Sequence, residues 1–227
     1  MMRAGPGRNA LLAPAGLVLA LLTGLAGCAG APPAPERFDF GLPAVDAGAG
    51  AAAAADAGPG IAQASVGAPA WLDTPALFYR LAYADAGQVH AYAQRQWAAP
   101  PAALLEQRLR ESLAAHRGAG GAGTGLSGSL RLRVELDEFS QVFATASASH
   151  AQLRARVELV QMHTNAVLAQ RRFVLEAPCP SADAAGALQG LRVAADRFIA
   201  QALDWAAQLP APAAPMNSTS QALGSKP

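Results

Sequence analysis

The sequence predicts a single α/β domain, in which a mixed, largely antiparallel sheet of about six strands packs two long helices on one face. Two observations carry this prediction. Apolar and charged residues alternate along 130–137 and again along 153–159, which is typical of strands with one buried face. Apolar residues recur every three or four positions along 104–113 and 188–205, which is typical of helices with one buried face.

The order of the elements follows from the same periodicity and from the turn residues between them. A turn at 163–165 separates two strands, so the strands from residue 130 onward are predicted to form an antiparallel meander. Pro100 and Pro101 begin the first long helix, because proline suits a first helical turn. The predicted strands are 38–40, 61–66, 77–83, 89–97, 130–137, 153–159 and 167–176, and the predicted helices are 101–117 and 183–208.

The N-terminus has the layout of a secretory signal peptide. Two arginines and no acid precede an apolar run over 10–22, which is too short for a comfortable permanent membrane span. The Leu-Ala-Gly-Cys stretch that ends at Cys28 resembles the bacterial lipobox. We therefore predict export, cleavage before Cys28, and a covalent diacylglycerol and N-acyl chain such as palmitate on that residue. The alternative is an ordinary signal peptide with a coincidental cysteine.

Composition shifts mark the boundaries of the predicted domain. Residues 1–27 are the lipoprotein signal peptide and 28–36 a proline- and alanine-rich lipidated tether. The domain extends over 37–209 and contains a flexible Ala/Gly loop at 44–60. Residues 210–227 are rich in proline, serine and alanine, so we expect a disordered tail.

The motifs argue against an enzyme. The net charge of +1 gives no strong field for nucleic acid, and the four histidines lack metal-ligand spacing. Lipidation of Cys28 leaves Cys179 alone, and a loop cysteine is the plainer interpretation. Asp137 and Glu138 are interpreted as a solvated strand end rather than an acid–base pair. We predict no catalytic residue, no metal and no cofactor apart from the lipid.

Aromatic residues gather between Trp71 and Trp97. Trp97 stands at a predicted strand-to-helix corner, where it either anchors the corner or contacts a partner. Together with Phe38-Asp39-Phe40-Gly41, the segments 71–81 and 92–101 resemble the ABC-type transport auxiliary lipoprotein family, which includes the paraquat-inducible C-type lipoproteins.

The resemblance extends over 38–208 and implies an α/β domain anchored at the periplasmic face of the outer membrane. Members of the family are encoded with ABC transporters that carry MCE domains and move lipids between the two bacterial membranes. The resemblance thus implies an MCE-domain protein, the permease–ATPase complex and a homo-oligomeric ring as partners. Ala29, in place of the aspartate that retains lipoproteins at the inner membrane, agrees with outer-membrane sorting. The candidate contact residues are Trp71, Tyr79, Arg80 and Trp97.

Two other functions stay open at this point. One is an outer-membrane assembly lipoprotein that partners a β-barrel protein. The other is a periplasmic lipid-binding shuttle, which requires a sizeable apolar pocket between the sheet and the helices.

Overall fold

The computed structural model describes residues 33–42, 60–118 and 130–209. By its internal contacts the chain divides into Met1–Ala34 and Pro35–Pro227, and the α/β domain lies in the second unit. The predicted signal peptide, the lipidation of Cys28 and the predicted tail lie outside the described residues, as does almost all of the predicted loop at 44–60.

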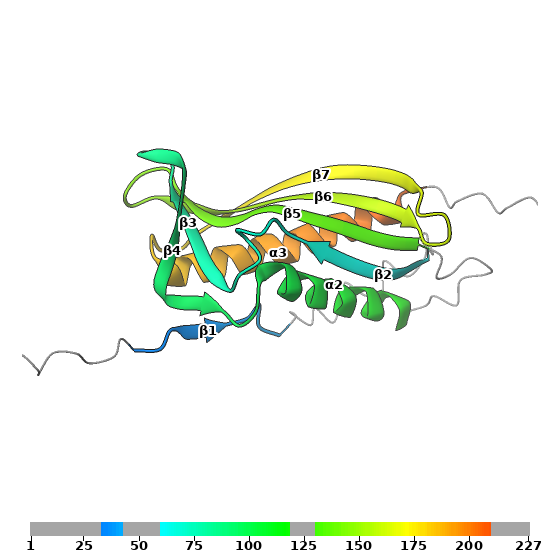
Figure 1. Cartoon of the computed structure of the whole chain (residues 1–227), viewed down its shortest axis with the longest axis horizontal. Coiled ribbons are helices and arrows are strands. Elements are labelled where there is room, and N and C mark those ends of the chain that lie inside the picture. The colour runs from blue at the N-terminus through cyan, green and yellow to red at the C-terminus, as the bar shows by residue number, and fades with distance from the viewer. Residues whose placement is uncertain (1–32, 43–59, 119–129, 210–227) are drawn as a thin grey trace, which may run out of the picture. The chain divides into compact units, whose positions relative to one another are not determined.

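The domain consists of a mixed sheet and two long helices, so the predicted fold class is confirmed (Figure 1). The strands follow the order β1-β4-β3-β5-β6-β7, and β2 pairs with β5 beside this path. The elements are β1 (Glu36–Phe38), β2 (Ile61–Gly67), β3 (Ala76–Leu81), β4 (Asp85–Trp97), α2 (Pro101–Gly118), β5 (Leu130–Phe143), β6 (Ser149–Gln161), β7 (Val167–Pro178) and α3 (Ala184–Ala207).

The predicted meander forms the antiparallel part of the sheet. Strands β5, β6 and β7 pair in antiparallel fashion, as does the β3–β4 hairpin. The pairings of β1 with β4, of β2 with β5 and of β3 with β5 are parallel, and the local pattern did not predict them. Strand β5 therefore holds the sheet together, because β2 covers the beginning of its edge and β3 covers the end.

Strand β5 is longer than predicted, and Asp137 and Glu138 do not end it. A register shift between Leu136 and Glu138 interrupts the pairing with β6, and the strand then continues to Phe143. Such a bulge moves the alternation of side chains by one position, so a search for strict period-two alternation stops there. The interpretation of Glu138 as a solvated strand end was wrong, because only 9% of this residue is exposed.

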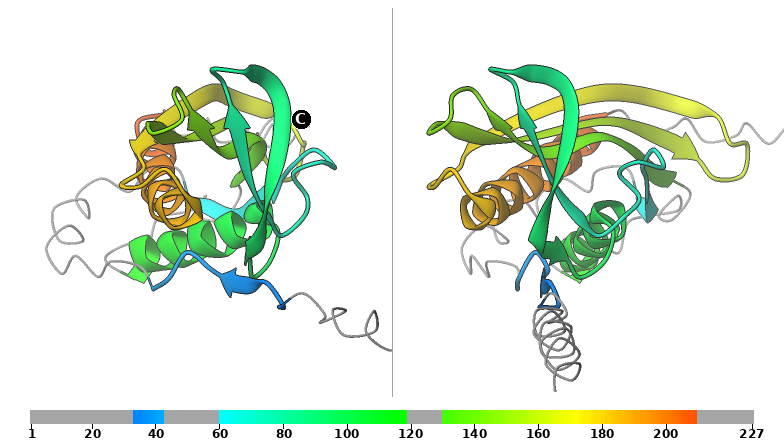
Figure 2. Two further views of the ribbon diagram at one scale, coloured as in Figure 1. Left: turned by 90° about the vertical axis from the view of Figure 1, so that its left-hand side faces the viewer. Right: turned by 60° about the vertical axis from the view of Figure 1, so that its left-hand side comes forward.

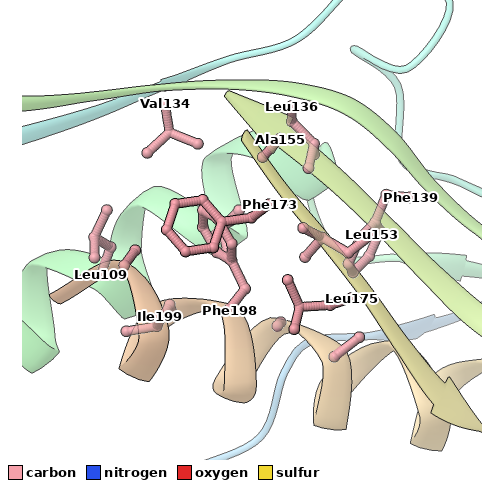
Figure 3. Packing of buried hydrophobic residues seen from close by; sticks show 14 of the residues in the cluster. Leu109, Val134, Leu136, Phe139, Leu153, Ala155, Phe173, Leu175, Phe198 and Ile199 are labelled. Carbon is pink, nitrogen blue, oxygen red and sulfur yellow. The ribbon is translucent and has the colours of Figure 1, made fainter. Parts of the chain in front are cut away.

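The core lies between the sheet and helix α3. Figures 1 and 2 show α3 running under β5, β6 and β7, with α2 beside it. Phe173 of β7 meets Phe198 of α3 edge-on, with ring centroids 5.6 Å apart. Leucines from the sheet fill the space around these rings (Figure 3). Burial of each such side chain contributes about 1.5–3 kcal/mol to folding.

Helix α3 begins where the sequence predicted it, and its first turn packs tightly on the turn that precedes it. Asp183 is the N-cap, and its carboxylate accepts a hydrogen bond of 2.9 Å from the Gly186 N–H. This bond, with a second from Ser181, lowers the pKa of Asp183 below its ordinary value. A Cβ atom on Gly186 would lie 2.0 Å from the Ser181 carbonyl oxygen, so glycine permits the tight entry into the helix.

Candidate partner-contact site

Trp71 and Arg80 lie together on the outer face of the sheet. Side chains alternate between the two faces of the sheet along β3. Leu77 is fully buried in the core, so Phe78 and Arg80 lie on the opposite, outer face. The guanidinium carbon of Arg80 lies 5.5 Å from the Trp71 ring centroid. The Trp71 ring also contacts Phe78, with centroids 5.5 Å apart. We call Trp71, Phe78, Arg80 and Glu138 the Trp71 cluster.

Glu138 fixes the position of Arg80 in this cluster. Arg80 Nη2 donates to Glu138 Oε2 at 2.8 Å, and Nε donates to Oε1 at 3.3 Å. The other terminal nitrogen, Nη1, donates to the carbonyl oxygens of Ala86 and Gly87 in β4. Because the two side chains are only 17% and 12% exposed, the forked pair is shielded from much of the solvent. It joins the β3–β4 hairpin to β5 and holds a cation under the indole ring.

Tyr79 faces away from the Trp71 cluster. Its ring lies 4.7 Å from the Tyr92 ring, stacks on His90 at 5.0 Å, and meets Phe143 at 5.9 Å, all measured between centroids. The Tyr92 hydroxyl donates to Gln141 Oε1 at 2.6 Å, and burial raises the pKa of this phenol. The structure therefore places Tyr79 and Arg80, which are neighbours in sequence, on opposite faces of the sheet.

Trp97 belongs to the core. It is fully buried, its ring meets Phe40 edge-on at 5.3 Å, and Phe139 lies 5.7 Å away. Its backbone N–H donates to the Pro75 carbonyl oxygen at 2.7 Å. Of the two roles that the sequence left open, the anchoring of the strand-to-helix corner is the one that this environment favours. The four candidate residues thus form one outer pair, one inner aromatic residue and one core residue.

A groove that sequence reasoning missed lies between the end of β2 and the start of α2. Its volume is about 560 Å³. Glu106 Oε2 accepts a hydrogen bond of 3.0 Å from the Val66 N–H, so the helix covers part of the β2 edge. No local pattern pointed to this contact, because the parallel pairing of β2 creates it. The lining residues are Val66, Gly67, Ala68, Asp73, Ala102, Ala103, Glu106, Gln107 and Arg110.

Among the described residues, no group of three or more histidine, cysteine, aspartate and glutamate side chains has a metal-binding arrangement. Cys179 is a free cysteine there, and burial raises the pKa of its thiol. No helix in the described ranges is long and apolar enough to cross a membrane. The Trp71 cluster has features of a recognition site, because its tryptophan is partly exposed and because tryptophan and arginine are enriched among interface hot spots.

Comparisons with known proteins agree with the fold described above. The family of ABC-type transport auxiliary lipoprotein components matches residues 40–202. A crystal structure of a protein from Xanthomonas campestris superposes with a TM-score of 0.57 at 20% sequence identity, covering 77% of this chain and 93% of that one. The crystal structure of an uncharacterized protein gives a TM-score of 0.50 at 16% identity, covering 65% and 94% of the two chains. No curated protein matches the chain.

Proposed function

This chain belongs to the family of ABC-type transport auxiliary lipoprotein components, and we propose that it links a periplasmic MCE-domain assembly to the outer membrane. The match over residues 40–202 carries this proposal, because it covers the domain that bears the Trp71 cluster. In this role the chain performs no chemistry. Lipid on Cys28 holds one end at the membrane, and the α/β domain presents a fixed surface to the transporter.

The geometry of the Trp71 cluster supports a docking role. Trp71 is 37% exposed, yet Phe78 and Arg80 fix the position of its ring. A large side chain held in place loses little conformational entropy when a partner covers it. The cation below the ring adds about 0.5–1 kcal/mol at an exposed site, and more once a partner excludes water.

The packing of the core supports an architectural role over a lipid shuttle. Phe173, Phe198 and the surrounding leucines occupy the space between the sheet and α3, where a shuttle requires an apolar cavity (Figure 3). The groove beside β2 is lined in part by the charged side chains of Asp73, Glu106 and Arg110, which suits a lipid chain poorly.

The proposal is tested by affinity purification from detergent-solubilised membranes with the tagged full chain. We expect the wild-type protein to recover an MCE-domain protein, and Trp71→Ala to reduce the recovery at least tenfold, as for a typical interface hot spot. Tyr83→Ala is the matched control, because Tyr83 is an aromatic residue of the β3–β4 turn with 52% exposure that lies outside the cluster. Recovery of a β-barrel protein without any transporter subunit would contradict the proposal.

A further inference from the structure

Three arginine side chains stand next to one another on the outer face of strands β6 and β7. Arg156 of β6 lies directly opposite Arg172 of β7, and Arg154 lies two residues before Arg156 on the same face. Directly opposed side chains in a sheet are about 4.5–5.5 Å apart at Cβ. The three guanidinium groups therefore share one small area, which we call the arginine patch.

The arginine patch lacks acidic partners within the domain. None of its three arginines has an ion pair within 4.0 Å in the part of the chain that the structure describes. Glu138 lies opposite Arg154 in the β5–β6 register, but its carboxylate is already bonded to Arg80. Glu135 lies opposite Arg156 and forms no ion pair with it at this distance.

The other acids of this face are engaged or distant. Glu158 is bonded to Arg133, and Glu176 stands four residues beyond Arg172, about 13 Å away along the strand. Like charges directly opposite each other destabilise a sheet. The facing of Arg156 and Arg172 is thus unfavourable for the isolated domain, and a partner that supplies negative charge would offset it.

The arginine patch continues the surface of the Trp71 cluster. Glu138, which lies opposite Arg154, is the residue that holds Arg80 beneath the Trp71 ring. On the other side of Arg154 lies Val174 of β7, an apolar residue with 61% exposure. The cluster and the patch therefore form one row across the outer face, and Figures 1 and 2 show both long helices on the other face of the sheet.

We propose that the arginine patch belongs to the docking surface of the Trp71 cluster and binds a carboxylate-rich surface of the transporter's periplasmic protein. This inference rests on the proposed function, and it specifies the chemistry of the partner. A guanidinium group presents a planar fork of donors that matches a carboxylate in bidentate fashion. Exposed charges around an aromatic anchor attract a complementary partner over a distance and orient it before contact.

The position of the patch favours a protein over a membrane surface as the source of negative charge. The chain enters the domain through β1, which stands at the other end of the strand order from β7. Five strand spacings of about 4.8 Å separate the two strands along the sheet, about 24 Å in all. Figure 1 shows β1 and β7 at opposite borders of the domain. A lipid anchor that precedes β1 therefore leaves the patch at the far end.

Association kinetics test the charge complementarity. The full chain in detergent is mixed with the purified MCE-domain protein at increasing sodium chloride concentrations. Arg156→Gln combined with Arg172→Gln should lower the association rate constant about tenfold at low salt and change the dissociation rate constant much less. The difference from wild type should vanish at high salt, because ions screen exposed charges. An association rate constant that is independent of salt would overturn the inference.

Two controls separate the patch from the total charge and from the stability of the fold. Arg37→Gln combined with Arg197→Gln removes two exposed arginines from β1 and α3, so the net charge changes equally, and the association rate constant should change less than about twofold. Because Arg156 and Arg172 repel each other, their replacement should leave the melting temperature unchanged or raise it. A lower melting temperature together with slower association would indicate a structural role instead and overturn the inference.

Photo-cross-linking in cells identifies what covers the patch. Benzoylphenylalanine in place of Val174 should form an adduct with the MCE-domain protein. The same group in place of Val193, a valine of α3 with 42% exposure, is the matched control and should form much less.

The adducts distinguish a failure of this inference from a failure of the proposed function. Adducts at position 174 that contain lipid and no protein would indicate a membrane surface and overturn the inference. The absence of any adduct at position 174, with an MCE adduct at position 71, would overturn the inference and leave the proposed function standing. A protein adduct at position 174 without a transporter component would contradict both.

Discussion

Replacing Glu138 by glutamine tests whether the Arg80–Glu138 pair holds the β3–β4 hairpin on β5. The substitution keeps the shape of the side chain and removes its charge. Both hydrogen bonds from Arg80 then lose their charged acceptor, while the bonds from Arg80 to Ala86 and Gly87 stay in place. Hydrogen bonds to charged groups contribute about 1.5–3 kcal/mol each.

The magnitude follows from the partial burial of the pair. Solvent reaches 17% of the Arg80 side chain and 12% of the Glu138 side chain, so the full value for a buried pair does not apply. We expect a loss of about 2 kcal/mol in the free energy of unfolding. For a domain of this size, such a loss lowers the melting temperature by about 4–8 °C.

The assay is thermal unfolding of the full chain followed by circular dichroism. Glu135→Gln is the matched control, because Glu135 is an exposed acid of the same strand with no ion pair within 4.0 Å among the described residues. Its effect should stay within about 0.5 kcal/mol. Equal melting temperatures for the Glu138→Gln and Glu135→Gln proteins would refute the assigned role of the pair.

Two further predictions concern the start of α3. Gly186→Ala should destabilise the domain by about 1–3 kcal/mol in urea unfolding, although alanine favours helices, because the new Cβ would lie 2.0 Å from the Ser181 carbonyl oxygen; an unchanged midpoint would contradict this. Asp183→Ala should cost about 1 kcal/mol at pH 7 through loss of the N-cap. Because the folded-state pKa of Asp183 is lowered, its contribution is present above the unfolded-state pKa of about 3.9 and is lost as the pH falls through the lower folded value. The difference between wild type and Asp183→Ala should therefore shrink in acid, and a difference that is constant with pH would contradict the role of the charge.

The sequence was most informative where one periodicity continued without interruption. The alternation over 130–137 and the helical spacing over 188–205 each reflect one element packed on one side, and both elements are present. The start of α3 was predicted to within one residue as well, and Asp183, the first residue of the predicted helix, is its N-cap. Local signals of this kind do not require knowledge of the rest of the fold.

The remaining features depend on contacts between distant segments. The bulge after Leu136 hid the second half of β5, and with it the burial of Glu138 beside Arg80, 58 residues away in sequence. The sequence selected Trp71, Arg80 and Tyr79 together. Alternation along β3 puts Tyr79 and Arg80 on opposite faces, but the contact of Arg80 with Glu138 depends on the pairing of β3 with β5. Trp97 is buried because Phe40 and Phe139 surround it, and no spacing in the sequence indicated that arrangement.

The most direct test of the central claim is photo-cross-linking in living cells. A photoreactive benzoylphenylalanine at position 71 of the full chain should form an adduct with an MCE-domain protein. The same group at position 83, on the turn between β3 and β4, should form much less of this adduct. Equal adducts at both positions, or adducts at position 71 that contain no transporter component, would contradict the account.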